Sequence, residues 1–124
     1  MTAREPYAGV MSGTSLDGVD AVVADFAPAS GRVCATLGAA HLPFPHDLRS
    51  ALAELQSSGP DEIARAADAG VALADLYAAA IGAACASASL APADLVAAGV
   101  HGQTVRHRPE RGWTVQLNDA ARAI

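Results

Sequence analysis

The sequence predicts an α/β domain that opens with a three-stranded antiparallel meander, continues through helices and returns to the sheet as a buried parallel strand. Three observations lead to this fold class. Two β-rich runs flank a turn of glycine and hydroxyl residues near the N-terminus, the middle of the chain has apolar residues at helical spacing, and a short apolar run follows. With 124 residues, 52% of them hydrophobic, the chain can form one modest core, so one domain is the upper limit.

The meander is predicted from the first third of the chain. Tyr7–Met11 and Val19–Phe26 are β-rich, and the second run alternates between two faces. Residues 28–31 contain proline, serine and glycine and supply a turn. Arg32–Leu42 is therefore predicted to return as the third antiparallel strand.

Two helices are predicted next. Leucines at positions 48, 52 and 55 lie at helical spacing in His46–Gln56, and Ser57–Gly59 ends this helix. Pro60 stands where a first helical residue would, and an alanine-rich helix runs from there to about Ser87. Its many alanines permit close packing against a sheet or a second helix.

The last third of the chain returns to strands. Leu95–Val100 is almost wholly apolar, which is typical of a parallel strand covered on both faces. Trp113–Leu117 alternates and is predicted as a further strand. Asn118 and Asp119 are cap-type residues that open a final helix.

Charge and composition exclude several functions. A formal net charge of -5 and a pI near 5.1 argue against nucleic acid or an anionic membrane surface as the main partner. All eight basic residues are arginine, so a Walker A loop, a Schiff-base lysine or a lysine-bound pyridoxal phosphate cannot be completed within this chain. Leu76–Ala93 lacks charges but is mostly alanine, which predicts no bilayer span.

The cysteines and the N-terminus predict a cytoplasmic protein. Cys34 and Cys85 are isolated and have no CxxC spacing, so two idle thiols are expected rather than a disulfide framework or a zinc site. Met1–Pro6 is short and leads straight into a predicted strand, so it is not expected to be a signal peptide.

The turn between the first two predicted strands suits a phosphate. Glycines at positions 13 and 18 let the main chain approach a ligand closely, and Thr14 and Ser15 add hydroxyl donors to the backbone amides. Asp17 and Asp20 can hold a magnesium ion directly or through water, because hard cations choose carboxylate oxygens. The predicted nucleotide-binding residues are Gly13, Thr14, Ser15, Leu16, Asp17, Gly18, Val19 and Asp20.

Two other interpretations of this loop stay open. Gly13–Asp17 nearly fits the GxSxG elbow of serine hydrolases, with Ser15 as the nucleophile, but the last glycine is missing and a strand follows where the elbow needs a helix. A glycine-rich hairpin turn without any ligand has the same composition.

A second polar motif follows directly on the apolar strand Leu95–Val100. In open α/β sheets, ligands bind at the carboxyl ends of the strands. An imidazole, an amide and a hydroxyl placed there can recognise a polyol or an amino sugar by hydrogen bonds. The predicted substrate contacts are His101, Gln103 and Thr104.

Two further groups of residues carry a less specific signal. His101, His107 and His41 lack a compact metal-binding spacing such as HExxH. Arginines at positions 106, 108 and 111 form, with His107, the basic cluster of an acidic chain. This cluster is either a clamp for phosphate or carboxylate or a solvated loop between two strands.

The two motifs resemble those of the anhydro-N-acetylmuramic acid kinases, bacterial enzymes of cell-wall recycling. The similarity rests on Gly9–Asp20, on His101–Val105 with His107, and on Val115–Leu117, in the order and spacing of the family. It spans essentially all 124 residues but only the opening portion of the family's longer, two-domain chain. The resemblance therefore implies an incomplete N-terminal ATPase-like domain over residues 1–124, without the second lobe.

The resemblance also implies a fold and a reaction. The fold is the ribonuclease-H-like domain shared by actin, hexokinase and the heat-shock ATPases, of which the predicted meander, helices and parallel strand would be the first part. The reaction uses ATP and Mg²⁺, opens the 1,6-anhydro ring with water and phosphorylates the 6-oxygen to give N-acetylmuramic acid 6-phosphate. The loop from Gly13 to Asp20 would bind the ATP phosphates, His101, Gln103 and Thr104 would lie toward the sugar, and the full-length enzyme would be a cytoplasmic homodimer.

Two departures bear on activity. Related sugar kinases have an aspartate where this chain, like the anhydro-sugar kinases, has Met11, so the metal ion depends on Asp17, Asp20 or residues elsewhere. The family's general base lies in a Gly-Asp-x-Arg segment, and no such segment occurs before Ile124. The chain alone is therefore expected not to turn over substrate, and a non-catalytic nucleotide-binding or interaction module is the alternative.

Overall fold

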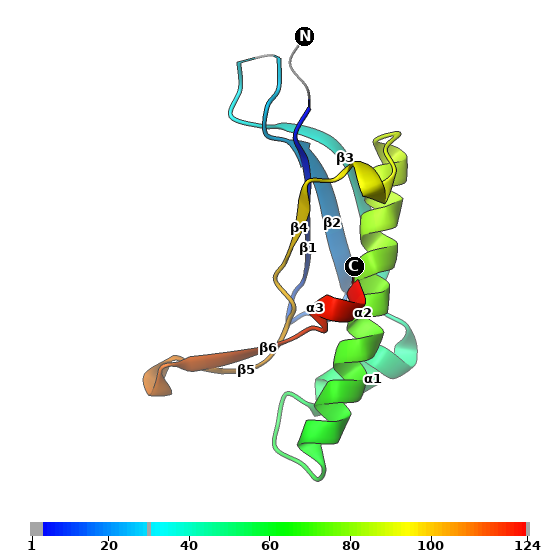
Figure 1. Ribbon diagram of the computed structural model, residues 1–124. Coiled ribbons are helices and arrows are strands. Elements are labelled where there is room, and N and C mark those ends of the chain that lie inside the picture. The colour runs from blue at the N-terminus through cyan, green and yellow to red at the C-terminus, as the bar shows by residue number, and fades with distance from the viewer. Residues whose placement is uncertain (1–3, 30, 124) are drawn as a thin grey trace.

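The computed structural model describes residues 4–29 and 31–123. A four-stranded sheet of order β3-β2-β1-β4 forms the centre, and a two-stranded sheet of β5 and β6 projects from one end of it (Figure 1). The helices and strands, in chain order, are β1 (Pro6–Ser12), β2 (Gly18–Asp25), β3 (Ala35–Pro43), α1 (His46–Glu54), α2 (Glu62–Ser87), the 3₁₀ turn η1 (Pro92–Asp94), β4 (Ala97–Val100), β5 (Gln103–Arg108), the 3₁₀ turn η2 (Pro109–Arg111), β6 (Trp113–Leu117) and α3 (Ala120–Ala123).

The predicted meander is confirmed. β1 pairs antiparallel with β2, β2 pairs antiparallel with β3, and β4 runs parallel to β1. Three antiparallel strands, then helices, then a parallel strand agree with the N-terminal part of an actin-like ATPase. β3 begins at Ala35 instead of Arg32, and Val33 before it is exposed. Position 30 of the predicted turn lies outside the described residues.

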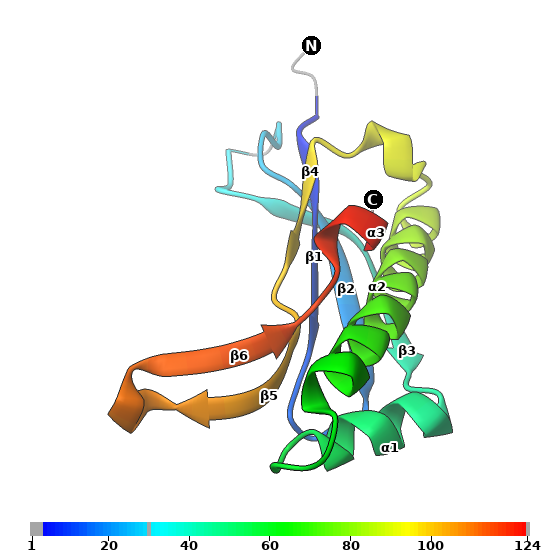
Figure 2. The ribbon, with the colours of Figure 1, turned by 60° about the horizontal axis from the view of Figure 1, so that its bottom comes forward.

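Helix α2 covers one face of the four-stranded sheet (Figure 2). Alternate residues of β2 point to this helix, and Val19 and Val23 are fully buried in one core with Leu73 and Tyr77 of α2. Each apolar side chain of this size stabilises the fold by about 1.5–3 kcal/mol when it leaves water. The alternating residues of β2 and the apolar residues at helical spacing in α2 therefore pack against each other in one core.

Small residues let α2 approach β3 closely. A Cβ atom on Gly38 would lie 2.6 Å from the carbonyl oxygen of Ala84 and 2.9 Å from the Cβ of Ala88. The Ser87 hydroxyl joins the two elements, because it donates to Ala84 O (2.7 Å) and accepts from the amide of Ala39 (3.1 Å). This contact explains why the helix is rich in alanine where it crosses β3.

The opposite face of the sheet is not covered by any element in the described part of the chain. Met11, Val22 and Phe26 lie on this face and are exposed. β4 is one of the two edge strands, and its first three residues are exposed. The prediction that Leu95–Val100 is covered on both faces is therefore wrong, because the apolar run lies at the edge of a sheet with helices on one face only.

Two other elements differ from their predictions. α2 begins at Glu62, and its N-cap Asp61 has a left-handed backbone (φ 57°), so Pro60 precedes the helix instead of being its first residue. Gln103–Arg108 forms β5, a strand that was not predicted. It pairs with β6, the strand predicted at Trp113–Leu117. Cross-strand pairing with Trp113–Leu117 orders this segment although its own pattern is polar.

The alanine-rich composition that predicts no bilayer span over Leu76–Ala93 is nevertheless apolar enough, in helix α2, to pass a test of length and composition for one. An 18-residue window has a mean hydropathy of 1.6, which by length and composition alone is enough to cross a membrane. Half of that window is buried in the structure, mainly by the contact with the sheet. The same composition is therefore explained by packing in a protein core.

The two cysteines differ in their surroundings. Cys34 is exposed and Cys85 is buried on α2, and neither forms a disulfide among the described residues. Burial raises the pKa of the Cys85 thiol, so this side chain stays protonated and unreactive at neutral pH.

Candidate functional site

The loop that joins β1 to β2, residues 13–17, is a tight turn with polar groups on its surface. The amide of Leu16 donates to Gly13 O at 3.1 Å, which closes the turn. Thr14, Ser15 and Asp17 are exposed, whereas the Leu16 side chain is buried in the core. Leu16 has a left-handed backbone (φ 57°), a conformation that is unfavourable for a leucine and is held here by burial of its side chain.

The remaining predicted phosphate-binding residues belong to β2. Gly18 begins the strand, Val19 is buried in the core, and Asp20 is exposed on the open face. A Cβ on Gly18 would clash with the carbonyl oxygen of Leu42 and lie 2.9 Å from the imidazole ring of His41, so this position requires glycine because the backbone of β3 lies against it. The loop leads from strand to strand and so lacks the strand-to-helix geometry of a hydrolase elbow at Ser15.

The second motif lies beside the loop. β4 is parallel to β1, so the carboxyl ends of both strands are at the same edge of the sheet. The amide of His101 donates to Val10 O at 3.1 Å and continues this pairing toward the loop. The predicted position of the motif, at the carboxyl end of the strand, is therefore confirmed, and the parallel pairing brings the two motifs together.

The three predicted sugar contacts have different surroundings. His101 is exposed, and its Nδ1–H donates to Gly102 O at 3.0 Å. The Thr104 hydroxyl accepts a hydrogen bond from Gln116 Nε2 at 3.0 Å. Gln103 is fully buried, and its Nε2 donates to Gly13 O at 3.2 Å. Gln103 therefore joins the second motif directly to the β1–β2 loop.

A buried hydroxyl pair lies at the start of the loop. The Ser12 Oγ and the Tyr77 hydroxyl are 2.7 Å apart and share a hydrogen bond. Burial raises the pKa of Tyr77 above its ordinary value, although the hydrogen bond to Ser12 acts in the opposite direction. Tyr77 therefore stays protonated and joins α2 to the last residue of β1.

The two aspartates predicted to hold a metal ion have different surroundings. Asp17 is exposed in the loop. Asp20 lies directly opposite His41 on β3, and the Nδ1–H of His41 donates to Asp20 Oδ1 at 2.8 Å. The described residues contain no group of three or more histidine, cysteine or acidic side chains that could hold a metal ion. The metal role of Asp17 and Asp20 therefore stays a prediction.

The open face next to this pair is hollowed. A depression of about 770 Å³ is lined by Asp20, His41, His101 and Met11, together with glycine, alanine and valine residues of β1, β2, β3 and β4. Its floor is apolar because those residues carry no polar side chain. The Asp20–His41 pair and His101 of the second motif therefore lie on the lining of one depression.

The arginines of the basic cluster contact different parts of the structure and do not converge on one point. Arg106 pairs with Glu62 at the start of α2 and donates through Nε to Leu55 O at 3.2 Å. The guanidinium of Arg111 lies 5.7 Å from the ring centre of Trp113. Arg106 therefore joins β5 to the two helices instead of forming a clamp with the other arginines.

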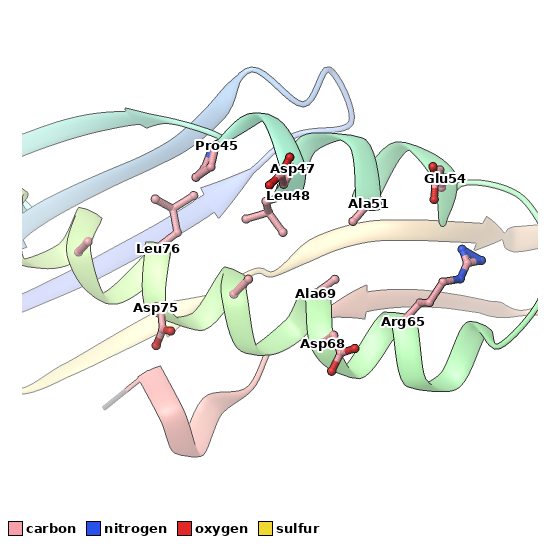
Figure 3. Close-up of a pocket in the computed structure, with 12 residues that line it drawn as sticks. Pro45, Asp47, Leu48, Ala51, Glu54, Arg65, Asp68, Ala69, Asp75 and Leu76 are labelled. Carbon is pink, nitrogen blue, oxygen red and sulfur yellow. The ribbon is translucent and has the colours of Figure 1, made fainter.

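A second hollow lies between α1 and α2, away from both motifs. Leu48 and Ala51 of α1 face Ala69 and Leu76 of α2 across it (Figure 3), and its volume is about 690 Å³. Its floor is apolar, and no residue of either motif lines it. We therefore place the candidate site at the β1–β2 loop and not in this groove.

The sequence did not reveal two of these contacts. The Ser12–Tyr77 pair joins residues far apart in the chain, and a tyrosine in an alanine-rich helix predicts only an apolar anchor. The Asp20–His41 pair follows from the register of β2 and β3, which includes a shift between Val23 and Ala24. From the sequence, His41 was considered only with His101 and His107 as a possible metal ligand, and this pair was not predicted.

Comparison with known proteins agrees with these motifs. A family model described as anhydro-N-acetylmuramic acid kinase matches residues 5–124. Proteins named anhydro-N-acetylmuramic acid kinase from Burkholderia pseudomallei (strain 1710b), Cupriavidus pinatubonensis and Thiobacillus denitrificans are 53%, 49% and 46% identical to the chain. The aligned segments cover 93%, 93% and 94% of this chain but 29%, 31% and 30% of those proteins.

The chain therefore spans less than a third of the length of the relatives it matches. The matched region includes both motifs, the loop and the strands that bring them together. The chain belongs to the anhydro-N-acetylmuramic acid kinase family.

Proposed function

We propose that this chain supplies the ATP phosphate-binding part of a kinase that acts on 1,6-anhydro-N-acetylmuramic acid. In the proposed reaction, water adds to C1 of the sugar and breaks its bond to O6, and O6 takes the γ-phosphoryl group of ATP. The products are N-acetylmuramic acid 6-phosphate and ADP. The names of the relatives support the substrate, and the place of such a reaction is the recycling of cell-wall sugars.

The observation that carries the proposal is the geometry of the β1–β2 loop. Its exposed residues are small or hydroxylated, and in the described part of the chain the amides of Thr14 and Ser15 have no hydrogen-bond partner. Amides and hydroxyls presented in this way bind the oxygens of a phosphate, and phosphoryl transfer depends mainly on such positioning and charge stabilisation.

Magnesium fits the loop through Asp17 more simply than through Asp20. Mg²⁺ is usually bound by one or two carboxylates together with waters and substrate phosphates, so an incomplete set of protein ligands suits it. Asp17 is an exposed carboxylate in the loop, whereas one oxygen of Asp20 already accepts the hydrogen bond from His41. Bound magnesium would neutralise charge on the phosphates, and Asp17 would hold it there.

The second motif is proposed to face the sugar. His101 is exposed at the carboxyl end of β4, and Thr104 follows it on β5. An imidazole and a hydroxyl can recognise sugar hydroxyl and acetamido groups. Gln103 was predicted to act with them, but its burial against the loop favours a role in holding the loop instead.

We also propose that residues 1–124 form an incomplete ATPase-like domain that binds nucleotide without turning over substrate. The sequence contains no Gly-Asp-x-Arg segment, which the family resemblance identifies with the general base. The same observation favours a second candidate, a non-catalytic nucleotide-binding or interaction module. In the kinase proposal the complete enzyme works in the cytoplasm as a homodimer.

A chimera tests the proposal. Residues 5–124 replace the matching N-terminal segment of the Burkholderia pseudomallei relative, and ATP-dependent phosphorylation of 1,6-anhydro-N-acetylmuramic acid is measured. We expect activity in the chimera and none in the isolated chain. We expect Asp17→Asn to lower kcat/KM at least about tenfold, equivalent to about 1.4 kcal/mol of transition-state stabilisation.

Asp68→Asn is the matched control, because Asp68 is an exposed aspartate on α2 outside both motifs. A folded chimera without activity, beside an active parent enzyme, would overturn the kinase proposal. Equal kinetics for the two variants would overturn the role of Asp17.

A further inference from the structure

We propose that two buried side chains, Gln103 and Tyr77, are positioning residues that hold the β1–β2 loop in its phosphate-binding shape. The inference rests on the proposed function and extends it to residues outside the loop. Both side chains are fully buried, and each makes a hydrogen bond at the junction between β1 and the loop. Neither therefore has to touch a ligand to affect its binding.

Gln103 contacts the loop through its side-chain amide. Nε2 donates to the carbonyl oxygens of Gly13 and Thr104, both at 3.2 Å. These two acceptors fix the orientation of the amide, because Oε1 in that place would face oxygen lone pairs. In the described part of the chain Oε1 has no hydrogen-bond partner. Because this oxygen is unpaired, the polar contacts that account for an amide at this buried position are the two that Nε2 donates, and one of them is to the loop.

The contact acts on the carbonyl that sets the shape of the turn. Gly13 O also accepts the hydrogen bond from the amide of Leu16, at 3.1 Å. Two donors thus hold this oxygen in place, and a carbonyl oxygen that turned outward would repel a phosphate. Fixing Gly13 O therefore favours the arrangement in which the amides of Thr14 and Ser15 are presented to a ligand.

Tyr77 acts at the preceding residue. Its hydroxyl lies 2.7 Å from Ser12 Oγ, and Ser12 is buried at the end of β1. The tyrosine ring contributes to the core between α2 and the sheet, and a phenylalanine would fill nearly the same space. The hydroxyl group adds a bond from the core helix to the residue at which the loop begins.

The experiment removes each hydrogen bond and keeps the side-chain volume nearly constant. Gln103→Met and Tyr77→Phe are compared with Gln116→Met and Tyr7→Phe in the 124-residue chain. Gln116 is a matched control because its amide contacts the hydroxyls of Thr104 and Thr114 and not the loop. Tyr7 is a matched control because it lies on the open face of the sheet, away from the loop, and makes an edge-to-face contact with Phe26.

Amide hydrogen exchange of Leu16, without ligand, is the first measurement. We expect Gln103→Met and Tyr77→Phe to accelerate it at least about tenfold, because loss of one net hydrogen bond changes a local equilibrium by roughly that factor. The exchange rates of amides in the middle of β2 should change less than about twofold in these two variants. The exchange rate of Leu16 should likewise change less than about twofold in both control variants. Unchanged Leu16 exchange in both variants, or equal acceleration throughout β2, would overturn the proposal.

The second measurement is the affinity of the chain for inorganic triphosphate, obtained by NMR titration. We expect Gln103→Met and Tyr77→Phe to weaken it about tenfold and the controls to leave it within about twofold. In the chimera, the same two variants should raise KM for ATP and leave KM for the sugar unchanged. A wild-type chain that binds no triphosphate would contradict the proposed function, while the exchange of Leu16 would still show whether these residues hold the loop.

Discussion

Asp25, the last residue of β2, stabilises the fold through its charge. Its Oδ1 accepts hydrogen bonds from the amides of Glu5 and Ala27, both at 2.9 Å. These two bonds, that from Glu5 first, hold the pKa of Asp25 below its ordinary value, although burial of the carboxylate acts in the opposite direction. Asp25 thus ties the chain before β1 and the turn after β2 to the end of the sheet.

The lowered pKa of Asp25 predicts how the stability of the fold depends on pH. The pKa is lower in the folded state, so the contribution of Asp25 is fully present above its unfolded value of about 3.9 and is lost as the pH falls through the folded value. We expect Asp25→Asn to lower the free energy of unfolding at about pH 7 and to approach the wild type at about pH 3. Urea unfolding at both pH values measures this. Asp68→Asn, at an exposed position within α2, is the control, and an equal loss from Asp25→Asn at both pH values would contradict the assignment.

The sequence motifs predicted which residues lie at the candidate site, but they did not predict what each side chain does there. Glycines and hydroxyls at positions 13–15 predicted a phosphate loop, and the structure places them in an exposed turn. Gln103 belonged to a polar motif and was predicted to contact a ligand, but its side chain is buried against the loop. Whether a polar side chain faces solvent or the core depends on the partner strand, which a local motif does not contain.

At the scale of elements, Gly38 is required by the contact between α2 and β3, whereas Gly82 of α2 takes no part in it. A Cβ on Gly38 would meet backbone and side-chain atoms of α2, whereas a Cβ on Gly82, within α2, would meet nothing within 4 Å. We expect Gly38→Ala to destabilise the fold by about 1–3 kcal/mol, because the helix must shift. We expect Gly82→Ala to stabilise it by about 0.5–1 kcal/mol, because glycine is unfavourable in a helix.

Denaturant unfolding of the two variants checks this contrast, and each is the control for the other. Equal effects of the two substitutions would show that α2 does not approach β3 as closely as described.

The elements with strong local patterns were predicted with their correct type. The alternation of Val19–Phe26 and the leucine spacing of His46–Gln56 both correspond to observed elements. β5 was missed because its stability comes from pairing with β6 and from Arg106, which binds Glu62 and Leu55. The exposure of β4 was also missed, because coverage of a strand depends on neighbours that its own sequence does not specify.

At the scale of the whole molecule, the fold separates a covered face from an open one. α2 lies on the covered face, while the open face carries Met11, Val22 and Phe26 and the Asp20–His41 pair at one end. Exposed apolar patches of this kind mark contact sites in soluble proteins. Both motifs lie at the edge of this sheet where β1 and β4 end, so the candidate site borders the open face.

The central claim is that the β1–β2 loop binds the triphosphate of ATP. The most direct measurement is an NMR titration of the ¹⁵N-labelled chain with Mg²⁺ and a non-hydrolysable ATP analogue, with AMP as the control ligand. We predict that the amides of Thr14 and Ser15 show the largest shifts with the analogue and none with AMP. Shifts confined to other residues, such as those of the groove between α1 and α2, would contradict the claim.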